Sequence, residues 1–334
     1  MRKHFALIGC GHIGRRHAAE MQRVGELLAV CDTHPIAARE LSKTYHCPAF
    51  HSLDELLQAG LPIDWLAVCT PNYLHAEHSM RALDAGWNVL CEKPMCLKLT
   101  EAEAMLEMAR STNRQLVVVK QNRFNPPVQR VKQWLNNNQL GRVLSFQVNG
   151  FWNRPDAYFE TSDWKGRKEM DGGALFTQFS HFIDLLYYLL GEVQHIQGIV
   201  RNAHHPNNST EDTGMALIEM KSGAVGTLHY TINAFDRNME GSITLFAEKG
   251  TVKIGGQYLN QLSYQLVEGV EPVQLPAGNT ANDYGLYQGT MSNHPLLYDL
   301  LVQPNAASTL LANAEDGLKT VEIINRFYQS AGIS

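Results

Sequence analysis

The chain has 334 residues, of which 44% are hydrophobic and 18% charged, and its formal net charge is −5. This length accommodates two domains that bury a large core without disulfides or structural metal ions. The small negative charge gives no general attraction to nucleic acids or anionic membranes, so neither is expected as a partner. No stretch approaches the roughly 20 apolar residues of a membrane helix, and the first residues lead into a strand rather than a signal peptide, which favours the cytoplasm.

The first third of the sequence alternates short apolar runs with segments of helical periodicity. The runs predict strands over 4–9, 27–32, 65–70, 88–93 and 115–120, and the periodic segments predict helices over 13–24, 35–45, 74–85 and 101–112. Thr100 and Glu103 form a capping box at the start of the last helix. Strands that alternate with helices predict an α/β fold with a doubly wound parallel sheet, covered on both faces.

Strand signals dominate the rest of the chain. Strands are predicted over 142–152, 195–203, 214–221, 224–233, 241–248 and 251–255, and helices over 126–138, 172–190, 291–302 and 312–330. Ser-Gly and Lys-Gly turns between the later strands are typical of antiparallel pairing. We therefore expect a first domain over 1–121 and a second, α+β domain over 122–334, whose large and mainly antiparallel sheet leaves one face open.

A glycine-rich loop over 9–14 follows the first predicted strand and opens a helix. In this context Gly9 permits the tight turn, Gly11 the close approach of a pyrophosphate, and Gly14 the packing of the helix on the strand. The backbone N–H groups of His12 and Ile13 lie at the helix start, where the helix dipole favours phosphate. The loop predicts a dinucleotide site.

Asp32 ends the second predicted strand. A carboxylate there bonds the ribose hydroxyls and repels a 2′-phosphate, so NAD is expected rather than NADP. Arg15, Arg16 and Arg39 lie close enough in sequence to leave some use of NADP open.

The third predicted strand leads into the turn Thr70-Pro71-Asn72, with His75 soon after. Doubly wound sheets bind ligands at this edge, so these residues are expected to flank the nicotinamide side of the cofactor. Capping of the following helix is the alternative role.

No metal site is expected. The six cysteines lie in the first third and form no C-x-x-C pair. His46, Cys47 and His51 are close in sequence, but their spacing fits no standard zinc pattern.

Lys93 follows an apolar strand and precedes Pro94. A lysine at this edge of the sheet, beside a dinucleotide, can orient a substrate hydroxyl and stabilise the oxyanion as hydride leaves. A solvated lysine without a catalytic role is the alternative.

His181 lies in the apolar helix predicted over 172–190, where Thr177, Asp184 and Tyr188 share its face. Because imidazole titrates near neutral pH, His181 can take the hydroxyl proton. A packed histidine satisfied by Asp184 is the alternative.

The glycine loop, the Thr-Pro-Asn turn, Glu92-Lys93-Pro94 and the Gly172-Gly173…His181…Asp184 segment together resemble the Gfo/Idh/MocA family of sugar and polyol oxidoreductases. The resemblance covers essentially the whole chain. It implies an N-terminal Rossmann domain, a cis bond before Pro94, a homodimer or homotetramer formed through the C-terminal sheet, Glu92 beside the cofactor, and Lys93 with His181 as the catalytic pair.

One position departs from the family pattern. Many members carry an aspartate four positions before the histidine, where this chain has Thr177 followed by Gln178. Both residues are expected to meet substrate, but a threonine cannot serve as a base. Proton transfer is therefore expected to rest on Lys93 and His181.

The resemblance extends to the branch that oxidises the 3-hydroxyl of UDP-N-acetylglucosaminuronate, in the synthesis of surface polysaccharides. It implies that the nucleotide sugar meets Arg154 and Tyr158, and also Asn293 and His294 at the end of the polar and aromatic segment 284–294. A dehydrogenase of inositol or of a simple sugar is the alternative substrate class. A catalytically silent NAD-binding regulator is the alternative of another kind.

Overall fold

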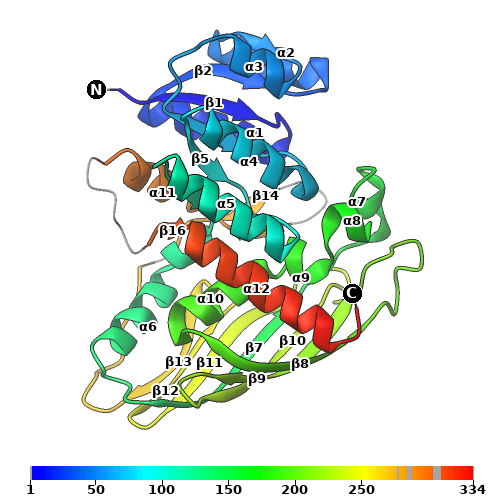
Figure 1. Cartoon of the computed structure of the whole chain (residues 1–334). Coiled ribbons are helices and arrows are strands. Elements are labelled where there is room, and N and C mark those ends of the chain that lie inside the picture. Colours follow the sequence, from blue (N-terminus) through cyan, green and yellow to red (C-terminus); the bar gives the residue numbers. More distant parts are fainter. Residues whose placement is uncertain (1, 277, 284–287, 304–309, 334) are drawn as a thin grey trace. The chain divides into compact units, whose positions relative to one another are not determined.

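The structure is a computed structural model that describes residues 2–276, 278–283, 288–303 and 310–333 (Figure 1). Its residue contacts divide into a first unit, Met1–Lys120 with His294–Val321, and a second unit, Gln121–Asn293 with Glu322–Ser334. The chain first passes from one unit to the other after Lys120, next to the boundary predicted after Gln121. The second domain was expected to extend without interruption to the end of the chain, whereas the structure returns 294–321 to the first unit.

The first unit is built on a seven-stranded sheet in the order β16-β6-β5-β4-β1-β2-β3. Its strands are β1 (His4–Ile8), β2 (Glu26–Cys31), β3 (Ala49–Phe50), β4 (Trp65–Val68), β5 (Asn88–Cys91), β6 (Leu116–Val118) and β16 (Ala312–Asn313). All neighbours pair in parallel except β16 with β6. The predicted doubly wound sheet is confirmed. β3 was not predicted, because two residues give too short a pattern.

The helices of the first unit are α1 (His12–Val24), α2 (Pro35–Tyr45), α3 (Leu53–Gln58), α4 (His75–Asp84), α5 (Leu99–Ser111) and α11 (His294–Leu301). The capping-box prediction is wrong: α5 starts at Leu99 after Lys98, and no side chain caps it. α11 packs against α1, which is why this late segment belongs to the first unit.

The carboxyl edge of this sheet gathers the predicted cofactor residues. β1 leads into Gly9, β4 into Thr70 and β5 into Glu92 and Lys93. β2 lies on one side of β1 and β4 on the other, so the order of the strands reverses at β1. Doubly wound folds bind nucleotides at such a reversal.

The second unit contains a seven-stranded sheet in the order β13-β12-β11-β7-β10-β9-β8. Its strands are β7 (Val143–Phe151), β8 (Val193–Arg201), β9 (Thr213–Met220), β10 (Val225–Thr231), β11 (Glu240–Ala247), β12 (Gly250–Gly255) and β13 (Gln261–Val267). Only β7 with β10 is parallel among its pairings, so the prediction of a mainly antiparallel sheet is confirmed. A separate ribbon pairs β14 (Ala281–Asp283) with β15 (Gln288–Met291).

Helices cover one face of the second sheet (Figure 1). They are α6 (Pro126–Asn136), α10 (Ser180–Leu190) and the end of α12 (Ala314–Ser330), while α7 (Asp156–Glu160), α8 (Lys168–Asp171) and α9 (Ala174–Thr177) are short. Gly150 and Gly198 make the packing close, since a Cβ there would lie 2.6 Å from the Phe179 ring and 2.4 Å from the Phe327 ring. No helix among the described residues is long and apolar enough to cross a membrane.

The other face of the second sheet is not covered by any helix of the described residues, and large apolar side chains are exposed on it among polar ones. Burial alternates along β9, so that every second side chain is exposed. Strand register places large apolar side chains on this same face: Ile199, Met215, Leu217, Val225, Phe246, Tyr264 and Leu266. Several exposed large apolar side chains on one face of a sheet are typical of an interaction surface.

Candidate active site

The glycine loop has the geometry of a nucleotide cradle. Gly9 has φ +94°, and a Cβ there would lie 2.4 Å from the Cys69 carbonyl oxygen, whereas a Cβ at Gly14 would lie 1.9 Å from the Gly9 carbonyl oxygen. Gly11 is exposed, and a Cβ on it would meet nothing within 4 Å. Gly9 and Gly14 are thus required by the fold, while open space lies over Gly11 at the start of α1. That space and the free helix start fit a pyrophosphate.

Gly11→Ala is expected to abolish most NAD affinity without loss of stability. Gly11 has φ −71° and ψ −166°, which alanine adopts, so only an approaching pyrophosphate would meet the new methyl group. Titration calorimetry with NADH and thermal unfolding measure the two effects separately. Gly14→Ala is the contrasting variant, expected to lower the melting temperature because its methyl group meets the loop backbone. Unchanged NADH affinity in Gly11→Ala would contradict the assignment.

Asp32 shapes the loop. Its Oδ2 accepts the Cys10 N–H at 2.7 Å and its Oδ1 accepts the His34 N–H at 2.7 Å, while the side chain remains partly exposed. Arg15, named in the sequence as a basis for NADP use, pairs with Glu40. The carboxylate is therefore held at the end of β2, and ribose recognition by Asp32 stays a prediction.

His75 joins the ends of β4 and β5. Its Nδ1 lies 2.6 Å from the Pro94 carbonyl oxygen and its Nε2 lies 2.8 Å from that of Thr70. Burial lowers the pKa of this imidazole, which the two carbonyls partly offset. Asn72 is buried in the turn before α4, whereas Pro71 and Thr70 are partly exposed. The structure brings the predicted turn and the Glu-Lys-Pro segment together through His75.

Lys93 lies just beyond β5 and is partly exposed. Its backbone N–H donates to Glu92 Oε2 at 2.9 Å, and the Lys93–Pro94 peptide bond is cis, as the family resemblance implied. Glu92 is buried, so its expected contact with the cofactor stays a prediction.

The predicted helix over 172–190 is broken. α9 ends at Thr177 and α10 begins at Ser180, so Thr177 does not continue the helical face of His181. His181 is 2% exposed. The Asp184 carboxylate is held by Arg123, whose Nε and Nη2 lie 2.9 and 2.7 Å from its two oxygens. Sequence reasoning missed Arg123, which lies 61 positions away.

Thr177 lies against a carboxylate from another position. Its hydroxyl donates to Asp171 Oδ1 and lies 3.0 Å from the Asp171 carbonyl oxygen. Asp171 is buried, and its Oδ2 accepts the Gly166 N–H at 2.6 Å. A carboxylate is thus present beside position 177, although the chain has none at that position. Sequence reasoning missed Asp171, because the helix was predicted to begin at Gly172 and the turn that brings Asp171 to Thr177 was not expected.

Arg154, Tyr158 and Gln178 form one hydrogen-bonded chain. Arg154 Nε donates to Gln178 Oε1 at 2.7 Å, and Gln178 Nε2 donates to the Tyr158 hydroxyl at 2.8 Å. All three side chains are buried. Tyr158, Gln178, Thr177 and Asp171 line one small pocket. The structure therefore brings Asp171 together with Tyr158, Thr177 and Gln178, three residues that were expected to meet substrate.

Asn293 and His294 have other hydrogen-bond or ring contacts. Asn293 is 2% exposed, and its Nδ2 donates to the Gln121 carbonyl at 3.1 Å and to Asn125 Oδ1 at 2.7 Å. His294 belongs to the first unit and is 0% exposed. The structure does not join either one to the Arg154 network, and their contact with substrate stays a prediction. Residues 284–287 of the same segment lie outside the described residues.

Glu211 lies just before β9, forms a hydrogen bond with α9 and has a raised pKa. Its Oε1 accepts the Tyr328 hydroxyl at 2.6 Å, the Tyr230 hydroxyl at 2.9 Å and the Leu175 N–H at 3.1 Å. Burial raises the pKa of Glu211 from 4.5 to about 7, and the hydrogen bonds oppose the rise.

This pKa predicts a loss of stability as the pH rises. Between pH 4.5 and about 7 the folded carboxyl keeps a proton that the unfolded chain has lost, so the folded state is destabilised progressively, by up to about 3 kcal/mol above pH 7. Glu211→Gln retains Oε1 as acceptor and cannot ionise. Thermal unfolding at pH 5 and pH 8 is expected to show a larger drop for the unchanged chain than for Glu211→Gln, and equal drops would contradict the assignment.

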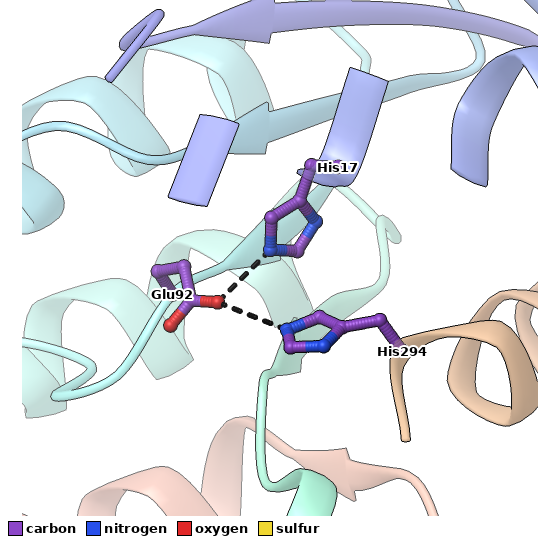
Figure 2. Close-up of side chains that lie close together, drawn as sticks. All are labelled: His17, Glu92 and His294. Atoms are coloured by element: carbon purple, nitrogen blue, oxygen red, sulfur yellow. Dashed lines mark hydrogen bonds and ion pairs between the residues drawn. The ribbon is translucent and has the colours of Figure 1, made fainter. Parts of the chain in front are cut away.

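His17, Glu92 and His294 form a cluster in the first unit (Figure 2). Among the described residues they are a group that could hold a metal ion, since one ligand atom from each lies within 4.8 Å of the others, and all are buried. The sequence expectation of no metal site did not consider this group. Its members are too far apart in sequence for spacing to reveal them, although His17 lies one turn after Gly14 on the buried side of α1.

Known proteins match both units. Residues 3–120 match the model of the oxidoreductase family with an NAD-binding Rossmann fold, and residues 128–253 match the GFO/IDH/MocA C-terminal domain. The chain belongs to the Gfo/Idh/MocA family. Its cofactor is NAD, as the glycine loop predicted, and this family membership confirms the resemblance noted in the sequence.

Relatives of this Gfo/Idh/MocA protein include enzymes that act on sugars. Glucose-6-phosphate 3-dehydrogenase of Bacillus subtilis (strain 168) is 30% identical over 230 residues, which are 68% of this chain and 64% of that enzyme, so the match spans less than two thirds of its length. The WlbA dehydrogenase of Chromobacterium violaceum, solved with NADH and UDP-GlcNAcA, is 31% identical, with a TM-score of 0.89 and coverage of 99% and 94%. WlbA of Bordetella pertussis, solved with the same two molecules, is 30% identical, with a TM-score of 0.84 and coverage of 99% and 97%.

Proposed function

We propose that this Gfo/Idh/MocA protein is an NAD-dependent dehydrogenase that oxidises the 3-hydroxyl of a UDP-N-acetyl-glucuronate-type nucleotide sugar to a ketone, in the cytoplasm and for polysaccharide synthesis. The observation that carries the proposal is the likeness to two WlbA structures over 99% of the chain, since both hold NADH and UDP-GlcNAcA. A lysine at the carboxyl edge of the nucleotide-binding sheet agrees with this chemistry.

Oxidation of the hydroxyl releases a proton and a hydride, and NAD supplies the hydride acceptor when bound. Lys93 orients the hydroxyl and stabilises the negative charge on its oxygen, and His181 takes the proton. Thr177 bonds a neighbouring hydroxyl, with its own proton directed to the Asp171 carboxylate. In this arrangement Asp171 fixes the direction of the Thr177 hydroxyl, so that its oxygen accepts from substrate.

Arg154 is the proposed anchor for the anionic part of the substrate. It donates hydrogen bonds to Gln178, Asn153 and Asn238, and a guanidinium is suited to bidentate binding of a carboxylate or phosphate. Tyr158 and Gln178 hold the guanidinium in place. Contact of Asn293 and His294 with the nucleotide sugar belongs to the same proposal.

A panel of sugars tests the proposal. Purified protein is incubated with NAD and, separately, UDP-N-acetylglucosaminuronate, glucose 6-phosphate or myo-inositol, and NADH formation is followed by absorbance. Turnover of the UDP-uronate with a 3-keto product supports the proposal. Turnover of only glucose 6-phosphate or myo-inositol would contradict the proposed substrate and support the alternative substrate class. That class is favoured by the Bacillus subtilis relative and by an inositol 2-dehydrogenase of Rhizobium meliloti. NADH binding without any turnover would indicate the silent regulator.

The open face of the second sheet is the proposed contact between copies of the chain. Leu217, on β9, is 65% exposed, and Leu217→Glu is expected to shift the protein from dimer or tetramer to monomer, because a charge in an apolar interface is strongly unfavourable. Light scattering after size exclusion measures the mass. Ile36→Glu, at a residue 62% exposed in α2, is the matched control and should leave the mass unchanged. An unshifted mass in Leu217→Glu would contradict the interface.

A further inference from the structure

The cluster of His17, Glu92 and His294 includes a fourth side chain, Tyr298. His17 Nε2 lies 2.9 Å from Glu92 Oε1, and His17 Nδ1 lies 2.7 Å from the Tyr298 hydroxyl. His294 Nε2 lies 3.7 Å from the same Glu92 oxygen, and its ring meets that of His17 edge-on, with centroids 5.2 Å apart. Figure 2 shows both imidazoles directed at one carboxylate oxygen. We call these four residues the Glu92 cluster.

The bond lengths favour hydrogen bonding over metal binding. Ligand atoms of a tetrahedral zinc ion at about 2.0–2.1 Å from the metal lie roughly 3.3 Å from each other. The His17–Glu92 separation of 2.9 Å is instead an ordinary hydrogen bond. Both nitrogens of His17 have partners: Tyr298 donates to Nδ1, and Nε2–H donates to Glu92. This assignment fixes the tautomer of His17 without an ion.

The charges of the cluster agree with an ionised Glu92. Burial by itself raises the pKa of Glu92, but the hydrogen bond from His17 and the nearby His294 ring outweigh it and hold the pKa well below its usual range. Burial lowers the pKa of His294, which favours the neutral imidazole. A buried carboxylate with fixed donors has little freedom to turn.

The second oxygen of Glu92 reaches Lys93. Oε2 accepts the backbone N–H of Lys93 at 2.9 Å, beyond the last residue of β5, where the ladder of the sheet no longer supplies a partner. On the other side of Lys93, His75 holds the Pro94 carbonyl at 2.6 Å. Two buried side chains therefore hold the backbone on either side of Lys93. Glu92 contacts residues of α1 and α11, and His75 belongs to α4.

We propose that the Glu92 cluster is a positioning device for Lys93: His17, oriented by Tyr298, locks the Glu92 carboxylate, and the carboxylate fixes the Lys93 backbone against the nucleotide loop. His17 lies on α1, three residues after Gly14. The helix that begins at the glycine loop therefore also determines the position of the Lys93 backbone. His17, Glu92 and Tyr298 are positioning residues here. The inference rests on the proposed role of Lys93, but its geometry is independent of which sugar is used.

A measurement without substrate tests the device. Lysines are reductively methylated with ¹³C-formaldehyde, the Lys93 signal is assigned by its loss in Lys93→Arg, and its chemical shift is titrated with pH. His17→Ala and Tyr298→Phe are expected to move the chemical shift of Lys93 toward that of exposed Lys98. His17→Gln keeps a donor at the position of Nε2 and is expected to restore most of the Lys93 signal. Leu56→Ala, a core change in the same unit, controls for general destabilisation.

Kinetics supply the second readout, with the sugar that the panel identifies. His17→Ala is expected to lower kcat by roughly 100-fold with little change in the KM for NAD, because misplacement of a reacting group by about 1 Å has that effect. If His17→Ala does not fold, Tyr298→Phe carries both measurements. An unchanged Lys93 signal in the folded variants would overturn the proposal. Binding of one zinc ion per chain that is lost in His294→Ala would also overturn it. A chain that oxidises no sugar refutes the proposed function but leaves the Lys93 measurement decisive.

Discussion

Replacing Lys93 by methionine is expected to lower kcat for sugar oxidation by roughly 10²–10⁴-fold while NADH affinity stays within about twofold. Methionine keeps an unbranched side chain of similar length but carries no ammonium group, so neither orientation of the hydroxyl nor stabilisation of the oxyanion remains. Steady-state kinetics with the substrate identified by the panel, together with calorimetry of NADH binding, separate the two effects.

Lys98→Met is the matched control for this prediction. Lys98 lies five positions further along, its side chain is 74% exposed, and it pairs with Glu101. Loss of an exposed pair of this kind has little effect, about 1 kcal/mol or less, and kcat should not change. A kcat of Lys93→Met within about tenfold of that of the unchanged chain would remove Lys93 from the mechanism and move its task to His181.

Arg123→Met is expected to destabilise the second unit by about 3–5 kcal/mol, the usual result of breaking a buried ion pair from one side. Arg123 and Asp184 have 1% and 2% side-chain exposure, and the guanidinium meets both carboxylate oxygens. Methionine leaves the Asp184 charge buried without the guanidinium. It also removes the contact of Arg123 Cζ with the Tyr188 ring, whose centroid lies 4.6 Å away. Urea unfolding followed by tryptophan fluorescence measures the change.

Two further variants give this experiment its control. Arg142→Met breaks the exposed pair with Glu248, where Arg142 is 67% exposed, and should change stability by less than about 1 kcal/mol. The double variant Arg123→Met with Asp184→Leu removes both charges and should recover much of the loss, since well-packed apolar side chains often replace a buried pair at no net cost. A loss of under about 1 kcal/mol in Arg123→Met would show that water reaches Asp184.

The nucleotide-binding sheet was predictable because its strands are buried on both faces and therefore appear as unbroken apolar runs. Gly9 and Lys93 stand at the ends of such runs, so their places at the carboxyl edge could be predicted with them. Short elements escaped: β3 and α3 have too few residues to show a period. The break after Thr177 escaped as well, because an apolar sequence that is buried all round carries no sign of where its helix stops.

Contacts between distant segments were beyond the sequence. Glu92 was placed beside the cofactor by family resemblance, yet its carboxylate bonds His17 and Lys93's own backbone. Asp171 was not considered, because nothing in its spacing from Thr177 shows that the chain turns back between them. Such pairs depend on tertiary packing rather than on periodicity, and only coordinates reveal them.

The path of the chain determines how the protein can be cut into pieces. A fragment ending at Gln121 would lack β16, whose residues 312 and 313 pair with Val118 and Val117, and it would present the bare edge of β6 as a template for aggregation. The same fragment would lose Tyr298, the partner of His17. A nucleotide-binding fragment that folds must therefore join 294–321 to 1–120 through a designed linker, and no single proteolytic cut can release one.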